Sequence, residues 1–231
     1  MAGEAINWYE TAAMKKHLQY QEPYPFDATQ IKVNSRILVC GTSGSGKTSC
    51  IATYLEKSPN TFAHIIVVHK EAEAIYDMLQ EELEGAITFY TDLGKLPTLK
   101  KLREKMDKDE RILLVIDDWV TDLHKFPNVK DYFIYGRRQQ IQIMCLVQSY
   151  YTTPKVLRSQ MSYLLLFKIT SKKDLNLILS DHLAGDLDIA DVKQLYEDAT
   201  DSNLDFFKIN CNTCPLNEKY SKNFTGFYKI D

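Results

Sequence analysis

Residues 41–48 carry the groups needed to hold a nucleoside triphosphate. They read Gly-Thr-Ser-Gly-Ser-Gly-Lys-Thr and match the pattern G-x-x-x-x-G-K-[ST] in full. The glycines allow consecutive backbone N–H groups to turn inward around phosphate oxygens, and Lys47 adds a positive charge there. The Thr48 hydroxyl is a ligand suited to Mg²⁺. The predicted nucleotide-binding residues are Gly41, Thr42, Ser43, Gly44, Ser45, Gly46, Lys47, Thr48 and Ser49.

Two adjacent carboxylates, Asp117 and Asp118, follow the most apolar strand predicted in the chain, residues 111–116. Open parallel sheets place their ligand sites at the carboxyl ends of strands. We predict that Asp117, together with Thr48, holds Mg²⁺, which keeps most of its waters and takes few protein ligands. Asp118 is predicted to activate the attacking water. The plainer alternative is that both aspartates only cap the following segment.

Gln148 ends the next predicted strand, residues 141–147. Its side-chain amide can donate to a phosphate oxygen and accept from a water at the same time, which a carboxylate or a lysine cannot do. If the two strands are adjacent, Gln148 lies beside Asp117 and is predicted to sense the γ-phosphate. The pattern alone is equally compatible with a glutamine that has no role.

Apolar segments alternate with amphipathic ones along most of the chain, which predicts a β-α-β order around these residues. The continuous apolar runs indicate parallel strands that are buried on both faces. Residues 204–210 alternate in polarity and predict an added strand near the sheet edge. We therefore predict an α/β P-loop NTPase fold, with a mostly parallel central sheet covered by helices on both faces and an additional C-terminal edge strand. The expected strands are 37–40, 65–68, 86–90, 111–116, 141–147 and 162–168, and the expected helices are 48–55, 71–83, one from about 97, 128–138, 172–182 and 189–199.

A chain of 231 residues suits a single domain. The stiff segment Glu22-Pro23-Tyr24-Pro25 marks the end of an N-terminal extension, so we predict an extension over residues 1–34 and an ATPase-type domain over residues 35–231. The hydrophobic and charged fractions, 45% and 26%, are ordinary for a globular protein. No apolar run is long enough to span a membrane, and we see no secretory signal. The protein is expected inside a cell.

The net charge of −3 argues against binding nucleic acid by bulk charge, so any such contact must be local. The densest basic stretch, residues 95–108, is predicted to be an exposed helix face. Three cysteines are predicted to be buried, reduced thiols: Cys40, Cys50 and Cys145. Cys211 and Cys214 form half of a zinc pattern without a second half, so a metal site is not favoured there. The five histidines, scattered without ligand spacing, receive no role: His17, His64, His69, His124 and His182.

The order and spacing of these motifs resemble the genome-packaging ATPases of large eukaryotic DNA viruses and their smaller relatives, within the FtsK-HerA group of pumping ATPases. The resemblance covers residues 36–168 and, less specifically, residues 206–224, which end in Asn223-Phe224. Most phosphate-loop families lack a glutamine at the end of the strand after the paired carboxylates. The motifs that carry the resemblance are the phosphate loop, Asp117-Asp118, Gly136-Arg137-Arg138, Gln148-Ser149-Tyr150, and Pro154 with Leu157-Arg158.

This resemblance implies a homo-oligomeric ring of five or six subunits that threads double-stranded DNA into a preformed capsid, using ATP and Mg²⁺. The capsid or a portal-like vertex would be its partner, and it would work in viral factories of the host cell, with the virion as a further location. In such rings an arginine of one subunit completes the neighbour's site. Arg137 is the first choice for this role, before Arg138 and Arg158. The competing interpretation is that Arg137 and Arg138 cap a helix end. The wider group often carries Asp-Glu in place of Asp117-Asp118. Because aspartate is shorter than glutamate, Asp118 would need the attacking water to lie closer.

Three other functions are compatible with a phosphate loop. A GTPase is disfavoured because Ser171-Lys172-Lys173-Asp174 only approximates the guanine-reading motif and no D-x-x-G follows Asp117. A nucleoside or small-molecule kinase, with lid arginines from residues 137–158, stays open, as does a scaffold that binds ATP only to assemble. For a DNA-threading ring, candidate DNA contacts are Tyr150, Tyr151 and the basic residues of 95–108.

Overall fold

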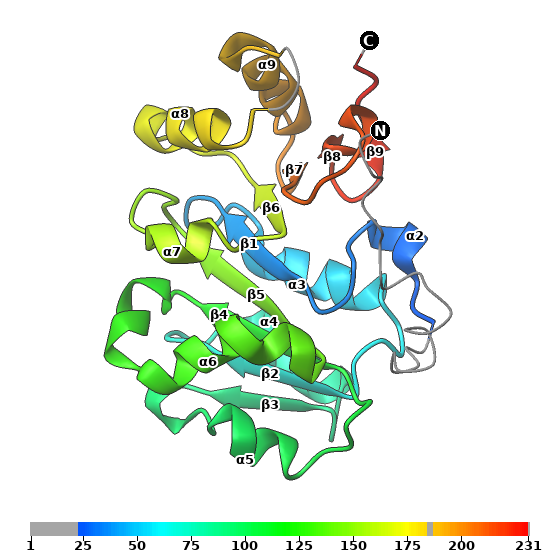
Figure 1. Ribbon diagram of the computed structural model, residues 1–231, viewed down its shortest axis with the longest axis vertical. Coiled ribbons are helices and arrows are strands. Elements are labelled where there is room, and N and C mark those ends of the chain that lie inside the picture. Colours follow the sequence, from blue (N-terminus) through cyan, green and yellow to red (C-terminus); the bar gives the residue numbers. More distant parts are fainter. Residues whose placement is uncertain (1–22, 184–186, 231) are drawn as a thin grey trace, which may run out of the picture.

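The computed structural model describes residues 23–183 and 187–230. Within them, one sheet has the strand order β3-β2-β4-β5-β1-β6-β7-β8-β9 (Figure 1). Neighbouring strands from β3 to β6 in this order are parallel, and β7 to β9 are antiparallel. The strands are β1 Arg36–Cys40, β2 His64–Val68, β3 Ile87–Tyr90, β4 Ile112–Asp117, β5 Ile141–Val147, β6 Tyr163–Leu166, β7 Phe207–Asn210, β8 Tyr220–Lys222 and β9 Gly226–Phe227.

Helices cover both faces of this sheet, so the predicted fold class is confirmed (Figure 1). Along β1, Ile37 and Val39 pack toward α3 and α4, whereas Leu38 and Cys40 belong to the core on the opposite face, with α5 to α9. This alternation is the period of two that a buried strand imposes. The helices are α2 Phe26–Thr29, α3 Lys47–Glu56, α4 Ala74–Glu82, α5 Leu99–Arg103, α6 Pro127–Tyr135, α7 Lys155–Arg158, α8 Lys172–Asp181 and α9 Ile189–Ala199, with short 3-10 turns η2 Leu93–Lys95, η3 Val120–Lys125, η4 Gly136–Gln139 and η5 Leu216–Glu218.

Strand β5 lies between β1, which leads into the phosphate loop, and β4, which ends in Asp117. Cys40 is level with Val147, and Asp117 is level with Leu146. Because these strands are parallel and in step, their carboxyl ends form one edge. The phosphate loop, Asp118 and Gln148 therefore start from the same edge of the sheet.

The C-terminal part contains more sheet than the one predicted edge strand. β7 pairs with β6 on one side, and β8 and β9 continue the sheet beyond it. Tyr220 is completely buried and stacks on Phe207, with ring centroids 5.5 Å apart. β8 and β9 have three and two residues, which is too short to show an alternating pattern. The sequence therefore did not predict these two strands.

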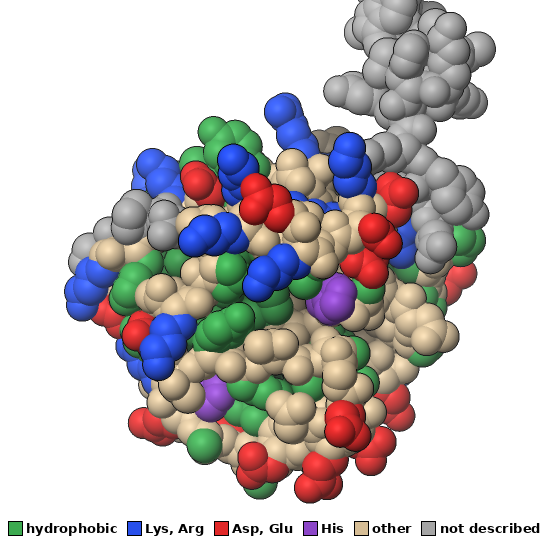
Figure 2. Space-filling view, turned by 90° about the horizontal axis from the view of Figure 1, so that it is seen from below, with side chains coloured by type: hydrophobic (Ala, Val, Ile, Leu, Met, Phe, Trp, Pro, Cys, Tyr) green, Lys and Arg blue, Asp and Glu red, His purple; other side chains and the backbone are tan. Residues whose placement is uncertain are grey.

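The basic segment 95–108 is a short helix followed by a turn, in place of one long exposed helix. Helix α5 ends at Arg103, whose guanidinium donates to the backbone oxygens of Lys108 and Glu110 and so fixes the turn. Its lysines are exposed. Figure 2 shows Lys and Arg mainly in the upper half of the face seen from below, with some Asp and Glu among them, and further Asp and Glu along the bottom of that face.

Part of the predicted N-terminal extension packs on the domain. Ile31 is 1% exposed and belongs to the core on the α3 side, and the backbone oxygen of Thr29 accepts a hydrogen bond from Lys208. Residues 1–22 of that extension lie outside the described residues. The boundary between residues 34 and 35 stays a prediction.

The thiols of Cys40, Cys50 and Cys145 are free and buried, as predicted. Burial raises the pKa of Cys50 to about 12, so this thiol stays protonated at neutral pH. Cys211 Sγ lies 3.6 Å from His182 Nδ1, and the described part of the chain holds no cluster of three or more His, Cys, Asp or Glu side chains suited to a metal ion. None of the helices in residues 23–183 and 187–230 is long and apolar enough to cross a membrane.

Candidate functional site

The phosphate loop connects β1 to α3 in a backbone conformation that requires glycine. Gly44 has φ +73°, and Gly46, directly before α3, has φ +100°. At Gly41 a side chain would meet Ser45 Oγ at 2.5 Å and Phe167 Cβ at 2.7 Å. The Ser45 hydroxyl is buried without a hydrogen-bond partner among the described residues. The loop therefore has the shape and the spare polar group of an anion cradle at a helix N-terminus.

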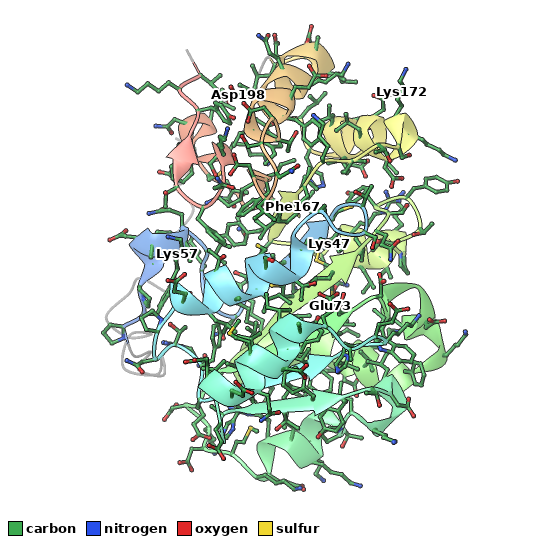
Figure 3. All side chains as sticks on the ribbon, turned by 180° about the vertical axis from the view of Figure 1, so that it is seen from behind. Lys47, Lys57, Glu73, Phe167, Lys172 and Asp198 are labelled. Atoms are coloured by element: carbon green, nitrogen blue, oxygen red, sulfur yellow. The ribbon has the colours of Figure 1, made fainter. Side chains whose placement is uncertain are left out.

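Lys47 lies beneath this cradle. Its side chain is buried, and its ammonium donates to the backbone oxygens of Gly41 and Thr42 at 3.0 and 2.9 Å. A buried cation at the N-terminus of a helix favours a bound polyanion. Figure 3 shows Lys47 between Phe167 on one side and Glu73 on the other.

One cleft of about 450 Å³ joins the phosphate loop to the predicted carboxylates. Of the nine predicted nucleotide-binding residues, six line it, and the other three form its frame. The carbonyls of Gly41 and Thr42 hold Lys47, and Ser45 packs against Gly41. The cleft is lined by Ser43, Gly44, Gly46, Lys47, Thr48, Ser49, Lys70, Glu71, Glu73, Asp117, Asp118, Gln148 and Leu204.

Asp117 is a buried carboxylate that is suited to a divalent cation. Burial raises the pKa of Asp117, and the Tyr76 hydroxyl, which donates to Asp117 Oδ2 at 2.6 Å, opposes this rise. The nearby charge of Asp118 raises it further. A cation would relieve the desolvation cost that the ionised carboxylate carries here. Thr48 lines the same cleft, so the two predicted ligands of Mg²⁺ fit the ion.

Asp118 and Gln148 contact each other across the ends of β4 and β5. Gln148 Nε2 donates to Asp118 Oδ2 at 2.7 Å. Asp118 has φ +58°, a left-handed conformation that aspartate tolerates better than most residues, and its side chain is exposed in the cleft. The predicted neighbour of Gln148 was Asp117, and the structure gives it the adjacent Asp118 as its hydrogen-bond partner. An exposed carboxylate held by an amide is an arrangement that can orient and deprotonate a water.

Several residues of the cleft were missed from the sequence. Lys70, Glu71 and Glu73 follow β2, which ends at the same edge as β4, so the rule applied to Asp117 would also have found them. Lys70 is engaged on the surface, with its ammonium 2.7 Å from Asp122 Oδ2. Leu204 comes from the α9–β7 connection, and no local pattern indicates its position.

The structure does not bring the three predicted arginines to the cleft of their own chain. Arg137 and Arg138 are exposed in η4, which precedes β5 and so lies at the amino end of the strand whose other end carries Gln148. At about 3.3 Å per residue, β5 separates them from the cleft by roughly 20 Å. Arg158 lies over the Tyr150 ring at 4.7 Å, with Nη1 3.5 Å from Asp181 Oδ2, and is largely enclosed by its own chain.

A Gly46→Ala variant is expected to lose more stability than Gly44→Ala. At Gly46, φ +100° is outside the region open to alanine and a Cβ would lie 3.3 Å from Phe167 Cε1, whereas at Gly44 φ is +73° and nothing lies within 4 Å. Leu204 Cδ2, 2.6 Å from that Cβ position, is the end of an exposed side chain that can move away. We expect a loss of about 2–3 kcal/mol for Gly46→Ala and about 1 kcal/mol for Gly44→Ala, measured by urea unfolding. Equal losses would show that φ +100° at residue 46 is no more costly for alanine than φ +73° at residue 44.

The sequence matches the family model described as Poxvirus A32 protein over residues 26–209. This range includes the phosphate loop, both aspartates, Gln148 and the three arginines. Among curated proteins, none matches the chain.

Solved structures share the fold at low sequence identity. The DNA-packaging ATPase B204 from Sulfolobus Turreted Icosahedral Virus is 17% identical with a TM-score of 0.59, covering 84% of this chain and 98% of that one. B204 from Sulfolobus turreted icosahedral virus 2 in complex with ATP-gammaS is 16% identical with a TM-score of 0.58 over the same shares. The cytoplasmic domain of the Thermomonospora curvata Type VII secretion ATPase EccC is 14% identical with a TM-score of 0.55, covering 85% of this chain and 26% of that one.

Proposed function

Because the chain belongs to the poxvirus A32 protein family, we propose that it hydrolyses ATP to drive double-stranded viral DNA into a preformed capsid. The observation that carries the proposal is the cleft that unites the phosphate loop, Asp117 and the Asp118–Gln148 pair. B204, which shares the fold, is described as a DNA-packaging ATPase, and one of its structures contains ATP-gammaS. These neighbours support ATP as the nucleotide here.

The chemistry assigned to each residue follows from its place in the cleft. The loop N–H groups and Lys47 bind the β- and γ-phosphates, and Asp117 and Thr48 hold Mg²⁺. When bound, Mg²⁺ neutralises charge on the phosphate oxygens. Asp118 accepts a proton from water, whose oxygen attacks the γ-phosphorus while the bond from that phosphorus to the β–γ bridging oxygen breaks, so that ADP leaves and inorganic phosphate forms. Gln148 donates to Asp118 with its amide nitrogen, so its amide oxygen is free to accept from the same water.

Arg137 is proposed to act in the site of a neighbouring subunit. It is exposed at the sheet edge opposite its own cleft, as a residue that serves a second copy should be. We propose that the chain assembles into a homo-oligomeric ring around DNA. We propose that the ring docks on the capsid or a portal-like vertex and works in viral factories of the host cell, with the virion as a further location.

The surface next to Gln148 is the proposed DNA contact. Tyr150 is excluded as a contact because it is 1% exposed, whereas Tyr151 is 52% exposed with Lys173 Nζ 3.6 Å from its ring centroid. The buried Asp174 accepts hydrogen bonds from the backbone nitrogens of Tyr150 and Tyr151, which ties this loop to α8. Residues 132–173 contain no Asp or Glu, and the exposed lysines that follow β5 in this segment are Lys155, Lys168, Lys172 and Lys173. A surface with lysines and without carboxylates suits a phosphate backbone, and Tyr151 lies three residues after Gln148.

The test of the proposed function is steady-state ATP hydrolysis with and without long double-stranded DNA, together with a sizing run. We expect an oligomer whose hydrolysis DNA stimulates. In a Tyr151→Ala/Lys173→Ala variant the stimulation should fall at least about threefold, because a phosphate contact is lost, while hydrolysis without DNA is unchanged. Lys193→Ala, which removes an exposed lysine on α9, is the matched control.

Two results would contradict the motor. Phosphate transfer to a small acceptor by a monomer would favour a kinase, and ATP binding without hydrolysis would favour a scaffold. The structure disfavours the kinase because residues 137–158, the candidate lid, include β5, all of whose residues are buried in the sheet. A buried central strand cannot open and close as a lid does.

A further inference from the structure

Leu204 is an exposed leucine held in a costly conformation above the phosphate loop. It has φ +71°, it is 60% exposed, and it lines the cleft. Its Cδ2 lies 2.6 Å from the position a Cβ would take at Gly46. A bulky residue rarely adopts a left-handed backbone, and exposing its side chain gains nothing in the protein alone. The surrounding chain must impose this placement.

The antiparallel pair β8 and β9 imposes this placement of Leu204. Lys222 Nζ lies 3.0 Å from Asp201 Oδ1 and 3.4 Å from Asp205 Oδ2, so it fixes both ends of the loop. Asn223 Nδ2 donates to Asp205 Oδ1 at 2.8 Å, and Asn223 Oδ1 accepts from the Phe206 nitrogen at 3.1 Å. These tethers come from residues beyond the end of the family match at residue 209. The loop is thus built in one position.

An aromatic cluster supports the loop from below. The Phe206 ring centroid lies 5.4 Å from that of Phe167 and 5.0 Å from that of Phe224. Phe167 is 1% exposed and also closes the space beside Gly41 and Gly46. The loop that carries Leu204 therefore rests on a packed aromatic cluster.

The two sides of the cleft receive different parts of a nucleotide. Asp117, Asp118 and Gln148 follow β4 and β5 on one side of β1, whereas Leu204 precedes β7 on the other side. A nucleotide whose γ-phosphate faces the carboxylates would have its opposite end toward Leu204. In Figure 3, Glu73 and Phe167 lie on opposite sides of Lys47.

We infer that Leu204 is the apolar surface on which the base of the bound nucleotide packs. The inference rests on the proposed nucleotide site and extends it to the base. Because a leucine side chain forms no hydrogen bonds, it contributes affinity for a flat ring without distinguishing adenine from guanine. Inorganic tripolyphosphate, which has no base, gains nothing from it.

The test compares ATP, GTP and tripolyphosphate binding by calorimetry in the full chain and in Leu204→Gly. Glycine accepts φ +71° without strain, so this variant removes the side chain and keeps the loop. We expect about 5- to 10-fold weaker binding of both ATP and GTP, the effect of losing one partly buried leucine contact, and unchanged tripolyphosphate binding. Met78→Ala, at an exposed residue on α4, is the control and should bind all three as the wild type does.

An Asn223→Ala variant tests the tether independently and should show the same loss for ATP and GTP alone. ATP binding by Leu204→Gly at wild-type affinity, or an equal loss for all three ligands, would overturn the role of Leu204. A wild-type chain that binds neither ATP nor tripolyphosphate would instead refute the nucleotide site itself. The two failures are therefore distinguishable.

Discussion

An Asp118→Asn variant is expected to bind ATP with wild-type affinity and to hydrolyse it about 10²- to 10⁴-fold more slowly, the range for loss of a general base. Asparagine has the shape of aspartate, and its Oδ1 can still accept the hydrogen bond that Gln148 donates. It cannot take a proton from water. The measurement is kcat under saturating ATP, with the affinity determined separately.

The matched control for this variant is Asp109→Asn, at an exposed aspartate outside the cleft. It should leave both hydrolysis and affinity unchanged. A decrease of less than about tenfold in Asp118→Asn would mean that Asp118 orients the water without accepting its proton. Loss of ATP affinity would instead place Asp118 among the residues that bind the nucleotide or its cation.

An Arg137→Ala variant is expected to bind ATP normally and to hydrolyse it about 10³-fold more slowly, because a trans-acting arginine offsets charge that develops on the γ-phosphate. Mixing it with inactive Lys47→Ala subunits should restore part of the activity. In the mixed ring, a site with intact Lys47 receives its arginine from the neighbouring Lys47→Ala subunit. The readout is hydrolysis as a function of the mixing ratio.

The control for this rescue mixes Lys47→Ala with Asp118→Asn. Both side chains line the cleft of one chain, so every site in the mixture has one defect and no activity should return. If activity returned in this control, mixing would restore hydrolysis by a process other than the sharing of an arginine between subunits. Failure of the Arg137→Ala mixture at every ratio would remove the trans-acting role and leave Arg137 as a cap of the helical segment before β5.

The sequence predicted those parts of the site that depend on local patterns. The phosphate loop follows a strand and opens a helix, so residues 41–49 were found together, and the apolar run before Asp117 marked the carboxyl end of a buried strand. The parallel core and the helices on both faces followed from the same alternation. The resemblance to viral packaging ATPases is confirmed by the match to the A32 family over residues 26–209.

The sequence did not predict features that depend on contacts between residues far apart in the chain. Tyr150 was a candidate for the surface, yet its ring is buried and its hydroxyl lies 3.0 Å from His182 Nε2, on an element 32 residues away. Leu204 reaches the phosphate loop only because Lys222 and Asn223 hold its loop. Neither arrangement has a periodic or motif signal, since each is set by tertiary packing that overrides local preference.

The strand order also determines when the phosphate loop can form during synthesis. Strands β2, β3 and β4 pair with one another and lie within residues 64–117, so they can associate while the chain is still short. Leu38 of β1, in contrast, pairs with Cys145 and Leu164, which leave the ribosome more than a hundred residues later. Pairing across such long separations is slow, and an apolar strand that waits for it is prone to aggregate. The nucleotide site therefore forms late in synthesis. Until β5 and β6 have been synthesised, β1 is an unpaired apolar strand that must be kept from aggregating.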